Sequence, residues 1–285
     1  MDINILLFGF SIGLVLLVKG ADEMVSSAIQ IALKFKLPSS IVGATFIGFG
    51  TSAPELFAST RAALKGDLDL GIGNIVGSNI ANSLLVVAVL YLALPKDYSK
   101  KINLNKISPT WMAILTTIFV STYLLTNKFP FLLGVALLVL VLYVIYKMIS
   151  SESDDEEGLI EEEKSYIWLR GGMSLVATLY GSQLVVENAV EIASIFGVSS
   201  LVIGSTIIAI GTSLPEVAGT ISAAKMRKPD IVFGNIFGSN LFNIGLVGGA
   251  AIMISPGEIS SAIDYQLLSL IHISEPTRRY AISYA

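Results

Sequence analysis

The stretch GFGTSAPELFAS, residues 48–59, places a glutamate, a proline and several hydroxyl residues inside an apolar segment. A second stretch, AIGTSLPEVAGT, residues 209–220, repeats its frame Gly-Thr-Ser-x-Pro-Glu. Glu55 in the first copy and Glu216 in the second therefore occupy equivalent positions. Because both acids stand where a charge is costly to keep, one physical explanation has to serve both.

The two copies lie in a chain with the composition of a membrane protein. Its 285 residues are 53% hydrophobic and 14% charged, with a mean hydropathy of +0.75, whereas soluble domains carry about 25% charged residues. Its apolar stretches have the ~17–25 residues that a membrane-spanning helix needs, while barrel strands are shorter and alternate. We expect an all-α polytopic helical membrane protein with eight spans: 3–18, 39–64, 70–94, 109–126, 129–149, 167–186, 200–224 and 231–254.

The basic residues predict the orientation of these spans. No Lys or Arg precedes the first apolar run, so we interpret that run as a span and not as a cleaved signal peptide. Alternate connections hold eleven basic residues on one side and three on the other, and the richer side should be cytoplasmic. The N-terminus is then outside. The richer set is Lys34, Lys36, Lys96, Lys100, Lys101, Lys106, Lys147, Lys164, Lys225, Arg227 and Lys228; the poorer set is Arg61, Lys65 and Lys128.

The chain also matches itself when it is shifted so that Glu55 falls on Glu216. With the same shift Gly20 falls on Gly181, and GNIVGSNIAN (73–82) falls on GNIFGSNLFN (234–243). The second copy starts after five spans, an odd number, so it enters the membrane upside down. We expect two inverted-topology repeats of five helices, the first over 1–149 and the second over 166–266. Many secondary transporters are built this way, with their sites at the midplane on interrupted helices.

Two segments fall outside the repeats. Residues 150–165, SSESDDEEGLIEEEKS, are interpreted as a solvated acidic cytoplasmic linker; a calcium-sensing loop is the alternative. After residue 266 no apolar run corresponds to spans four and five, so the second repeat should be truncated after three helices. The amino-acid sequence of residues 267–285 resembles translated sequencing-adapter DNA, and we expect this tail to be non-native. The only histidine, His272, lies in it and is assigned no role.

The two glutamates need a partner. A carboxylate at mid-bilayer costs ~2.5–3.5 kcal/mol on insertion scales, and such residues face a cavity or a counter-charge. Neither copy contains Lys or Arg. The expected partner is therefore a mobile cation. The alternative is a protonated glutamate that hydrogen bonds to a neighbouring helix.

Each copy also supplies neutral oxygens. On a helix, Thr51 and Ser52 precede Glu55 by four and three residues and share its side. Pro54 has no N–H and collides with the carbonyl four residues earlier, so the Gly50 carbonyl should lose its helical partner. Carboxylates, hydroxyls and bared carbonyls are ligands of hard cations such as Ca²⁺, which takes six to eight oxygens. The second copy repeats the set with Gly211, Thr212, Ser213, Pro215 and Glu216.

The GNxxGSN motifs add a polar stripe to each half. Ser78 and Asn82 share a helical face, as do Ser239 and Asn243, and we expect these four residues to be ligands. The alternative is that they serve only as packing and interhelical hydrogen bonds. We prefer that alternative for two asparagines that lie off the face, Asn79 and Asn240.

Together, ATFIGFGTSAPELFAS with GNIVGSNIAN and STIIAIGTSLPEVAGT with GNIFGSNLFN resemble the two alpha-repeats of the calcium:cation antiporter superfamily. The GTSxPE motif resembles that of the sodium/calcium exchanger branch of this superfamily, of prokaryotic type. The resemblance covers roughly residues 1–255. It implies ten helices in two inverted halves and exchange of Na⁺ for Ca²⁺ at four sites between the second, third, seventh and eighth helices. It also implies that the first and sixth helices slide across this core.

The resemblance assigns roles residue by residue. It makes Glu55 and Glu216 the central acids and gives Thr51 and Thr212 carbonyl ligands. Asn243 departs from the family pattern, because many members carry aspartate there, and in potassium-dependent relatives that acid is important for K⁺. The departure favours potassium independence. The residues that would line the sodium sites are Ser52, Ser78, Ser213, Ser239, Asn82 and the backbone of Ala209.

We therefore predict a secondary antiporter, not an enzyme and without a cofactor, that exchanges Na⁺ for Ca²⁺ as a monomer in the lipid bilayer of a prokaryotic inner membrane. A proton/calcium antiporter is the first alternative. A cation channel and a non-functional fragment are alternatives of another class. The net charge of −4 leaves no basic surface for nucleic acid, and the lack of cysteine excludes disulfides and thiolate metal sites.

Overall fold

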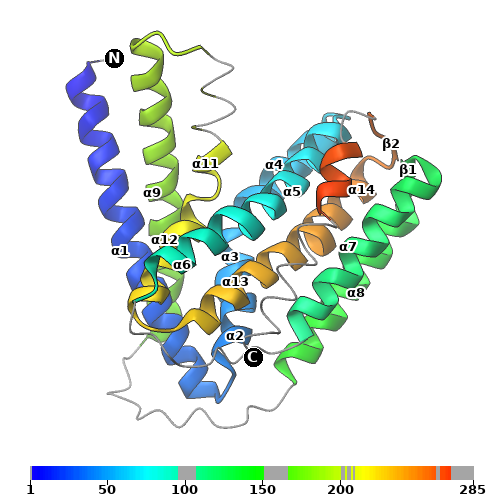
Figure 1. Ribbon diagram of the computed structural model, residues 1–285, viewed down its shortest axis with the longest axis horizontal. Helices are drawn as coiled ribbons and strands as arrows, with labels where there is room; N and C mark the ends of the chain where they lie inside the picture. Colours follow the sequence, from blue (N-terminus) through cyan, green and yellow to red (C-terminus); the bar gives the residue numbers. More distant parts are fainter. Residues whose placement is uncertain are drawn as a thin grey trace.

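The computed structural model of the chain describes residues 2–95, 107–150, 166–199, 209–260 and 264–270, with the single residues 203 and 207. Nearly all of these residues are helical, which confirms the predicted all-α fold, and Figure 1 shows the long helices lying side by side. The first half contains α1 (Ile3–Phe35), α2 (Ser39–Val42), the π-helix η1 (Gly43–Gly48), α3 (Phe49–Thr51), α4 (Ala53–Leu64), α5 (Leu68–Ala81), the π-helix η2 (Asn82–Val86), α6 (Val87–Ala93), α7 (Ile107–Thr126) and α8 (Phe131–Ile149).

The second half repeats the element boundaries of the first. Under the shift that places Glu55 on Glu216, the first residues of α4, α5 and η2 fall on the first residues of α12, α13 and η4. Residues 264–270 are also helical. The internal repeat read from the sequence is thus a repeat of structure. The second half contains α9 (Ile167–Ile195), α11 (Ala209–Gly211), α12 (Leu214–Lys225), α13 (Pro229–Phe242), η4 (Asn243–Gly248) and α14 (Gly249–Ile254).

Six of the eight predicted spans meet the length and apolarity of a membrane crossing. Among the described residues, five helices qualify directly: Ile3–Phe35, Leu68–Ala93, Ile107–Thr126, Phe131–Ile149 and Pro229–Ile254. The bent pair Ser39–Thr51 and Ala53–Leu64 qualifies as one broken span. The expected span at 167–186 forms the 29-residue helix α9, which is long enough but carries more polar residues. Apart from residues 203 and 207, the beginning of the expected span at 200–224 lies outside the described residues, and its end forms α11 and α12.

Helices α1 and α9 show that the two repeats are inverted. They are counterparts in sequence, yet they run antiparallel along each other at one edge of the molecule (Figure 1). A Cβ added to Gly20 would lie 2.7 Å from the backbone nitrogen of Thr178, and one added to Gly181 would lie 2.8 Å from the carbonyl oxygen of Gly13. Gly20 and Gly181 are themselves counterparts, so each half presents its glycine to the other, as a pseudo-twofold axis requires.

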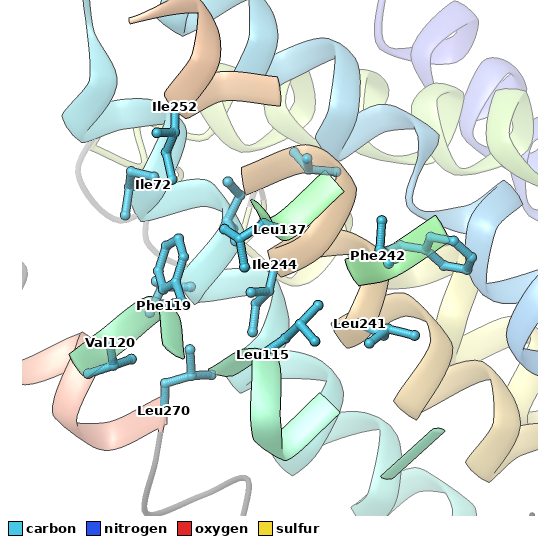
Figure 2. Packing of buried hydrophobic residues seen from close by; sticks show 14 of the residues in the cluster. Ile72, Leu115, Phe119, Val120, Leu137, Leu241, Phe242, Ile244, Ile252 and Leu270 are labelled. Carbon is cyan, nitrogen blue, oxygen red and sulfur yellow. The ribbon is translucent and has the colours of Figure 1, made fainter. Parts of the chain in front are cut away.

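A large apolar cluster joins the two halves on the opposite side. Figure 2 shows Ile72 of α5, Phe119 of α7, Leu137 of α8 and Ile244 of η4 packed together, all fully buried. Leu270, from the helical residues 264–270, is buried in the same cluster. The expectation that residues from 267 onward are non-native stays a prediction, and most of that tail, like residues 151–165 of the acidic linker, lies outside the described residues.

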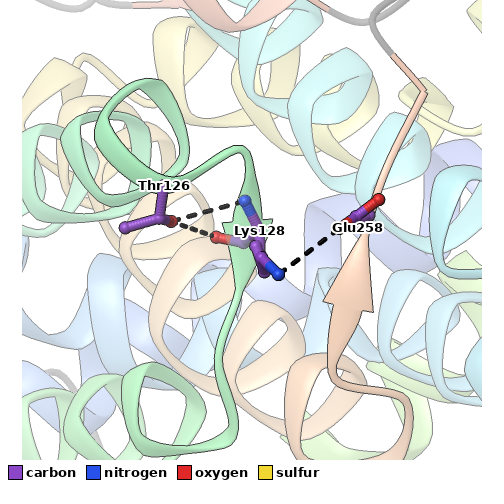
Figure 3. Close-up of polar contacts among 3 residues, drawn as sticks. All are labelled: Thr126, Lys128 and Glu258. Carbon is purple, nitrogen blue, oxygen red and sulfur yellow. Dashed lines mark hydrogen bonds and ion pairs between the residues drawn. The ribbon is translucent and has the colours of Figure 1, made fainter.

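A short two-stranded sheet ties the α7–α8 hairpin to the segment after α14. Strand β1 (Lys128–Phe129) pairs antiparallel with β2 (Gly257–Glu258). Lys128 Nζ lies 3.4 Å from Glu258 Oε1, and the Thr126 hydroxyl donates to the Lys128 carbonyl oxygen at 3.0 Å (Figure 3). Both charged side chains are largely exposed, so this ion pair contributes only about 0–1 kcal/mol.

Gly181→Ala tests the symmetric glycine contact. The new methyl group would collide with the α1 backbone, so we expect it to destabilise the fold by about 1–3 kcal/mol. The matched control is Gly172→Ala on the same helix, where an added Cβ meets nothing within 4 Å. Because alanine is the better helix former, this control should keep or raise stability. Thermal unfolding in detergent measures both variants, and equal midpoints would contradict the packing described here.

Candidate cation site

Both copies of the Gly-Thr-Ser-x-Pro-Glu frame interrupt a helix, as the sequence predicts. In the first copy α3 ends at Thr51 and α4 begins at Ala53, with a bend of 45° between the two segments. In the second copy α11 ends at Gly211 and α12 begins at Leu214. The prolines stand in the first turn of the new helices, where a missing N–H costs nothing. Each glutamate follows directly and therefore lies at the positive end of a helix dipole.

Glu55 and Glu216 are buried in the centre of the protein. Their side chains are 4% and 1% exposed. Ser78 Oγ donates to Glu55 Oε1 at 3.3 Å, whereas Oε2 of each glutamate is buried without a hydrogen-bond partner. No ion pair within the described part of the chain reaches either acid. Two buried carboxyl groups thus keep open oxygens, which is the arrangement that a bound cation would satisfy.

The two acids are near neighbours in the folded chain. They lie close enough for their charges to interact, and Glu216 also lies beside the Thr51 hydroxyl. No group of three or more His, Cys, Asp or Glu residues gathers within the described ranges. The remaining oxygens around the two carboxylates are therefore neutral, as the sequence predicts.

Thr51 and Ser239 bring the two halves together beside the acids. The Ser239 hydroxyl lies 3.4 Å from the Thr51 hydroxyl and 3.2 Å from the carbonyl oxygen of Gly48. This approach is possible because Gly238 has no side chain: a Cβ there would lie 2.5 Å from Cα of Ala44. Gly234 and Gly238 thus bring the second GNxxGSN motif close to another helix, whereas a Cβ added to Gly77 in the first motif would meet nothing within 4 Å.

The other predicted ligands are mostly buried near the same elements. Ser52 and Asn243 each keep a buried side-chain oxygen without a partner. Thr212 instead occupies an exposed turn, so the structure does not repeat there the buried position of Thr51. Ala209 is placed only as the first residue of α11, and its predicted backbone role stays a prediction. The buried members of the predicted set are Thr51, Ser52, Glu55, Ser78, Asn82, Ser213, Glu216, Ser239 and Asn243.

Two π-helices follow the site and were not anticipated. They begin at Asn82 and at Asn243, the last residues of the two polar stripes. A π-helix inserts an extra residue into a helical turn, and such insertions occur frequently at functional sites. The sequence offers one signal for these π-helices: both begin at the same position of the two repeats.

Ser182 was also missed by the sequence analysis. It lies buried on α9, and its Oγ donates to the carbonyl oxygen of Gly211 at 3.2 Å. Gly211 is the carbonyl that Pro215 was predicted to free, so the freed acceptor finds its donor on another helix. The first copy has Ala21 at the position equivalent to Ser182, which offers no hydroxyl.

Comparison with known proteins agrees with this geometry. A family model described as "Sodium/calcium exchanger protein" matches residues 5–151 and 166–274. Putative antiporter CaxA of Alkalimonas amylolytica is 38% identical over 265 residues, which cover 88% of this chain and 81% of CaxA. Inner membrane protein YrbG of Escherichia coli K12 is 32% identical over 280 residues, which cover 92% of this chain and 85% of YrbG. The structure of the sodium–calcium exchanger NCX_Mj matches with a TM-score of 0.80 at 27% identity, covering 97% of this chain and 90% of that one.

An inverted-repeat helical fold with paired central acids defines an integral membrane cation transporter. More particularly, the chain belongs to the sodium/calcium exchanger family. The resemblance read from the two GTSxPE motifs is thereby confirmed.

Ser182→Ala tests the bond between α9 and the second break. The variant leaves the Gly211 carbonyl without its side-chain donor in an apolar interior, so we expect a loss of about 1–3 kcal/mol of stability. Ser174→Ala is the matched control, because the Ser174 hydroxyl donates to Gly171, a carbonyl of its own helix. Urea or thermal unfolding in detergent compares the two. Equal stability of both variants would show that the Gly211 carbonyl does not depend on Ser182.

Proposed function

We propose that the protein exchanges Na⁺ for Ca²⁺ across a membrane by alternating access, with Glu55 and Glu216 as ligands shared by both ions. The observation that carries this proposal is the pair of buried carboxylates whose Oε2 atoms have no partner in the protein. The relative named as a sodium–calcium exchanger shares the fold over nearly the whole chain, which supports the same pair of ions.

The charges and oxygens of the site suit competition between the two ions. Two carboxylates neutralise one Ca²⁺ or two Na⁺, so the same pair can serve either ion. Ca²⁺ takes six to eight oxygens, more than the two carboxylates supply, and the surrounding hydroxyl, amide and backbone oxygens would complete the set. The proposed neutral ligands are the backbone carbonyls of Thr51, Thr212 and Ala209 and the side chains of Ser52, Ser213, Ser78, Ser239, Asn82 and Asn243.

Three further properties belong to the proposal. Asn243 is neutral, which supports transport that does not need K⁺. The bias of basic residues supports an N-terminus outside the cell and a cytoplasmic 150–165 segment. The relative YrbG is named as an inner membrane protein, and one chain carries both acids, which supports an inner-membrane protein that works as a monomer.

Calcium flux in proteoliposomes tests the function. Vesicles loaded with Na⁺ and diluted into Na⁺-free buffer should take up ⁴⁵Ca²⁺, at a rate that is unchanged when K⁺ is replaced by choline. Glu55→Gln and Glu216→Gln should each reduce the uptake by about tenfold or more, because a hydrogen bond or ligand contact to a charged group contributes about 1.5–3 kcal/mol and 1.4 kcal/mol is tenfold.

The matched control is Glu258→Gln, which removes an exposed carboxylate paired with Lys128 and should keep the wild-type rate. Uptake that follows a pH gradient and ignores Na⁺ would identify a proton/calcium antiporter. Unitary currents in a planar bilayer would identify a channel. Folded protein without any calcium flux would identify a non-functional fragment.

A further inference from the structure

Four asparagines form a hydrogen-bonded network between the two halves. Asn82 Nδ2 donates to Asn240 Oδ1 at 3.2 Å, and Asn243 Nδ2 donates to Asn79 Oδ1 at 2.9 Å. Each bond joins one repeat to the other. Because Asn79 and Asn240 are equivalent positions of the two repeats, and so are Asn82 and Asn243, the two bonds are counterparts under the pseudo-twofold axis.

Asn79 and Asn240 are fixed by further bonds of their own. Asn79 Nδ2 donates to the carbonyl oxygen of Asn240 at 3.2 Å, and Asn240 Nδ2 donates to Ser83 Oγ at 3.0 Å. Both side chains are only 1% exposed. Their amide groups are therefore held in one orientation, with the oxygen already accepting a bond from the other half.

The orientation of an asparagine amide decides whether it attracts or repels a cation. Its oxygen is an acceptor that can ligate a metal ion, whereas its NH₂ group carries two donors and would repel the ion. A rotation of about 180° around the last side-chain torsion exchanges the two groups. In Asn82 and Asn243 the NH₂ group is occupied by the neighbouring half, which leaves the oxygen for the site. Asn243 Oδ1 is buried and has no partner in the protein.

We propose that Asn79 and Asn240 are positioning residues for the cation site. Each binds the NH₂ group of the ligand asparagine of the opposite repeat and thereby holds that ligand's oxygen toward the ion. The inference rests on the proposed function, because it takes Asn82 and Asn243 as ligands. It adds two residues outside the predicted ligand set, and it makes the geometry of each half-site depend on the other repeat.

A double-mutant cycle tests the inference without transport. Equilibrium binding of ⁴⁵Ca²⁺ is measured on the full purified chain in detergent for Asn82→Ala, Asn240→Leu and the double variant. We expect each single variant to raise the Kd for Ca²⁺ about tenfold, since a buried hydrogen bond or an unsatisfied donor changes the free energy by an amount of this order. The double variant should bind as weakly as Asn82→Ala alone, because Asn240 acts only through Asn82.

The symmetric cycle with Asn243→Ala and Asn79→Leu should behave in the same way. Asn240→Ala is the milder substitution if Asn240→Leu does not fold. The control is Asn188→Leu, a buried asparagine whose Nδ2 donates within its own helix, to the Leu184 carbonyl; it should leave the Kd unchanged.

The outcomes separate the two levels of the proposal. If Asn82→Ala and Asn243→Ala leave the Kd unchanged, the asparagines are not ligands, and that part of the proposed function fails. If those variants weaken binding but the Asn240 variants do not, the site stands and the positioning role is wrong. The same conclusion follows if the increases in Kd of the two single variants multiply in the double variant. A purely structural role would give such multiplied effects.

Discussion

Two carboxylates that share a buried space without a basic partner impose the central constraint on this protein. Their desolvation has to be compensated, and the chain itself compensates it only in part, with the first turns of two helices and the Ser78 hydroxyl that donates to Glu55, while Oε2 of each acid stays without a partner. The breaks at Ser52 and Ser213 place Glu55 and Glu216 in the first turns of α4 and α12, where the helix dipole favours an anion. Glycines in the crossing helices then allow the backbones to approach closely enough to surround the acids.

Duplication with inversion makes this arrangement possible in a single chain. A motif used once would supply one acid, and its copy in the opposite orientation supplies the second. The contacts that join the halves follow the same symmetry, from the glycines of α1 and α9 at the edge to the asparagines of α5 and α13 in the centre. The halves are therefore interlocked by contacts to which both contribute.

Much of this could be read from the sequence, because proline, glycine and buried acids act through local rules. The spacing of Pro54 and Glu55 predicts a broken helix with an acid just after the break, and the internal repeat predicts its counterpart. What the sequence could not supply are the partners across space. No periodicity indicates that Ser182 meets the Gly211 carbonyl, or that the NH₂ group of Asn243 meets Asn79. The exposed position of Thr212 was missed because Thr212 was assumed to have the same surroundings as Thr51, its equivalent in the sequence repeat.

The two repeats also differ in several contacts around the breaks and along α1 and α9. A freed carbonyl in an apolar interior needs a donor; at Gly211 it is Ser182, whereas the equivalent position in the other half is Ala21. Arg170 and Glu23 pair α9 with α1 at 2.9 Å, and their counterparts are Gly9 and Leu184, which line an open groove of about 710 Å³ between the same helices. A site open equally to both faces of a membrane would leak, so an exchanger must hold its two halves in unequal environments at any moment. The unequal contacts of α1 and α9 lie on the helices that pack against the broken segments.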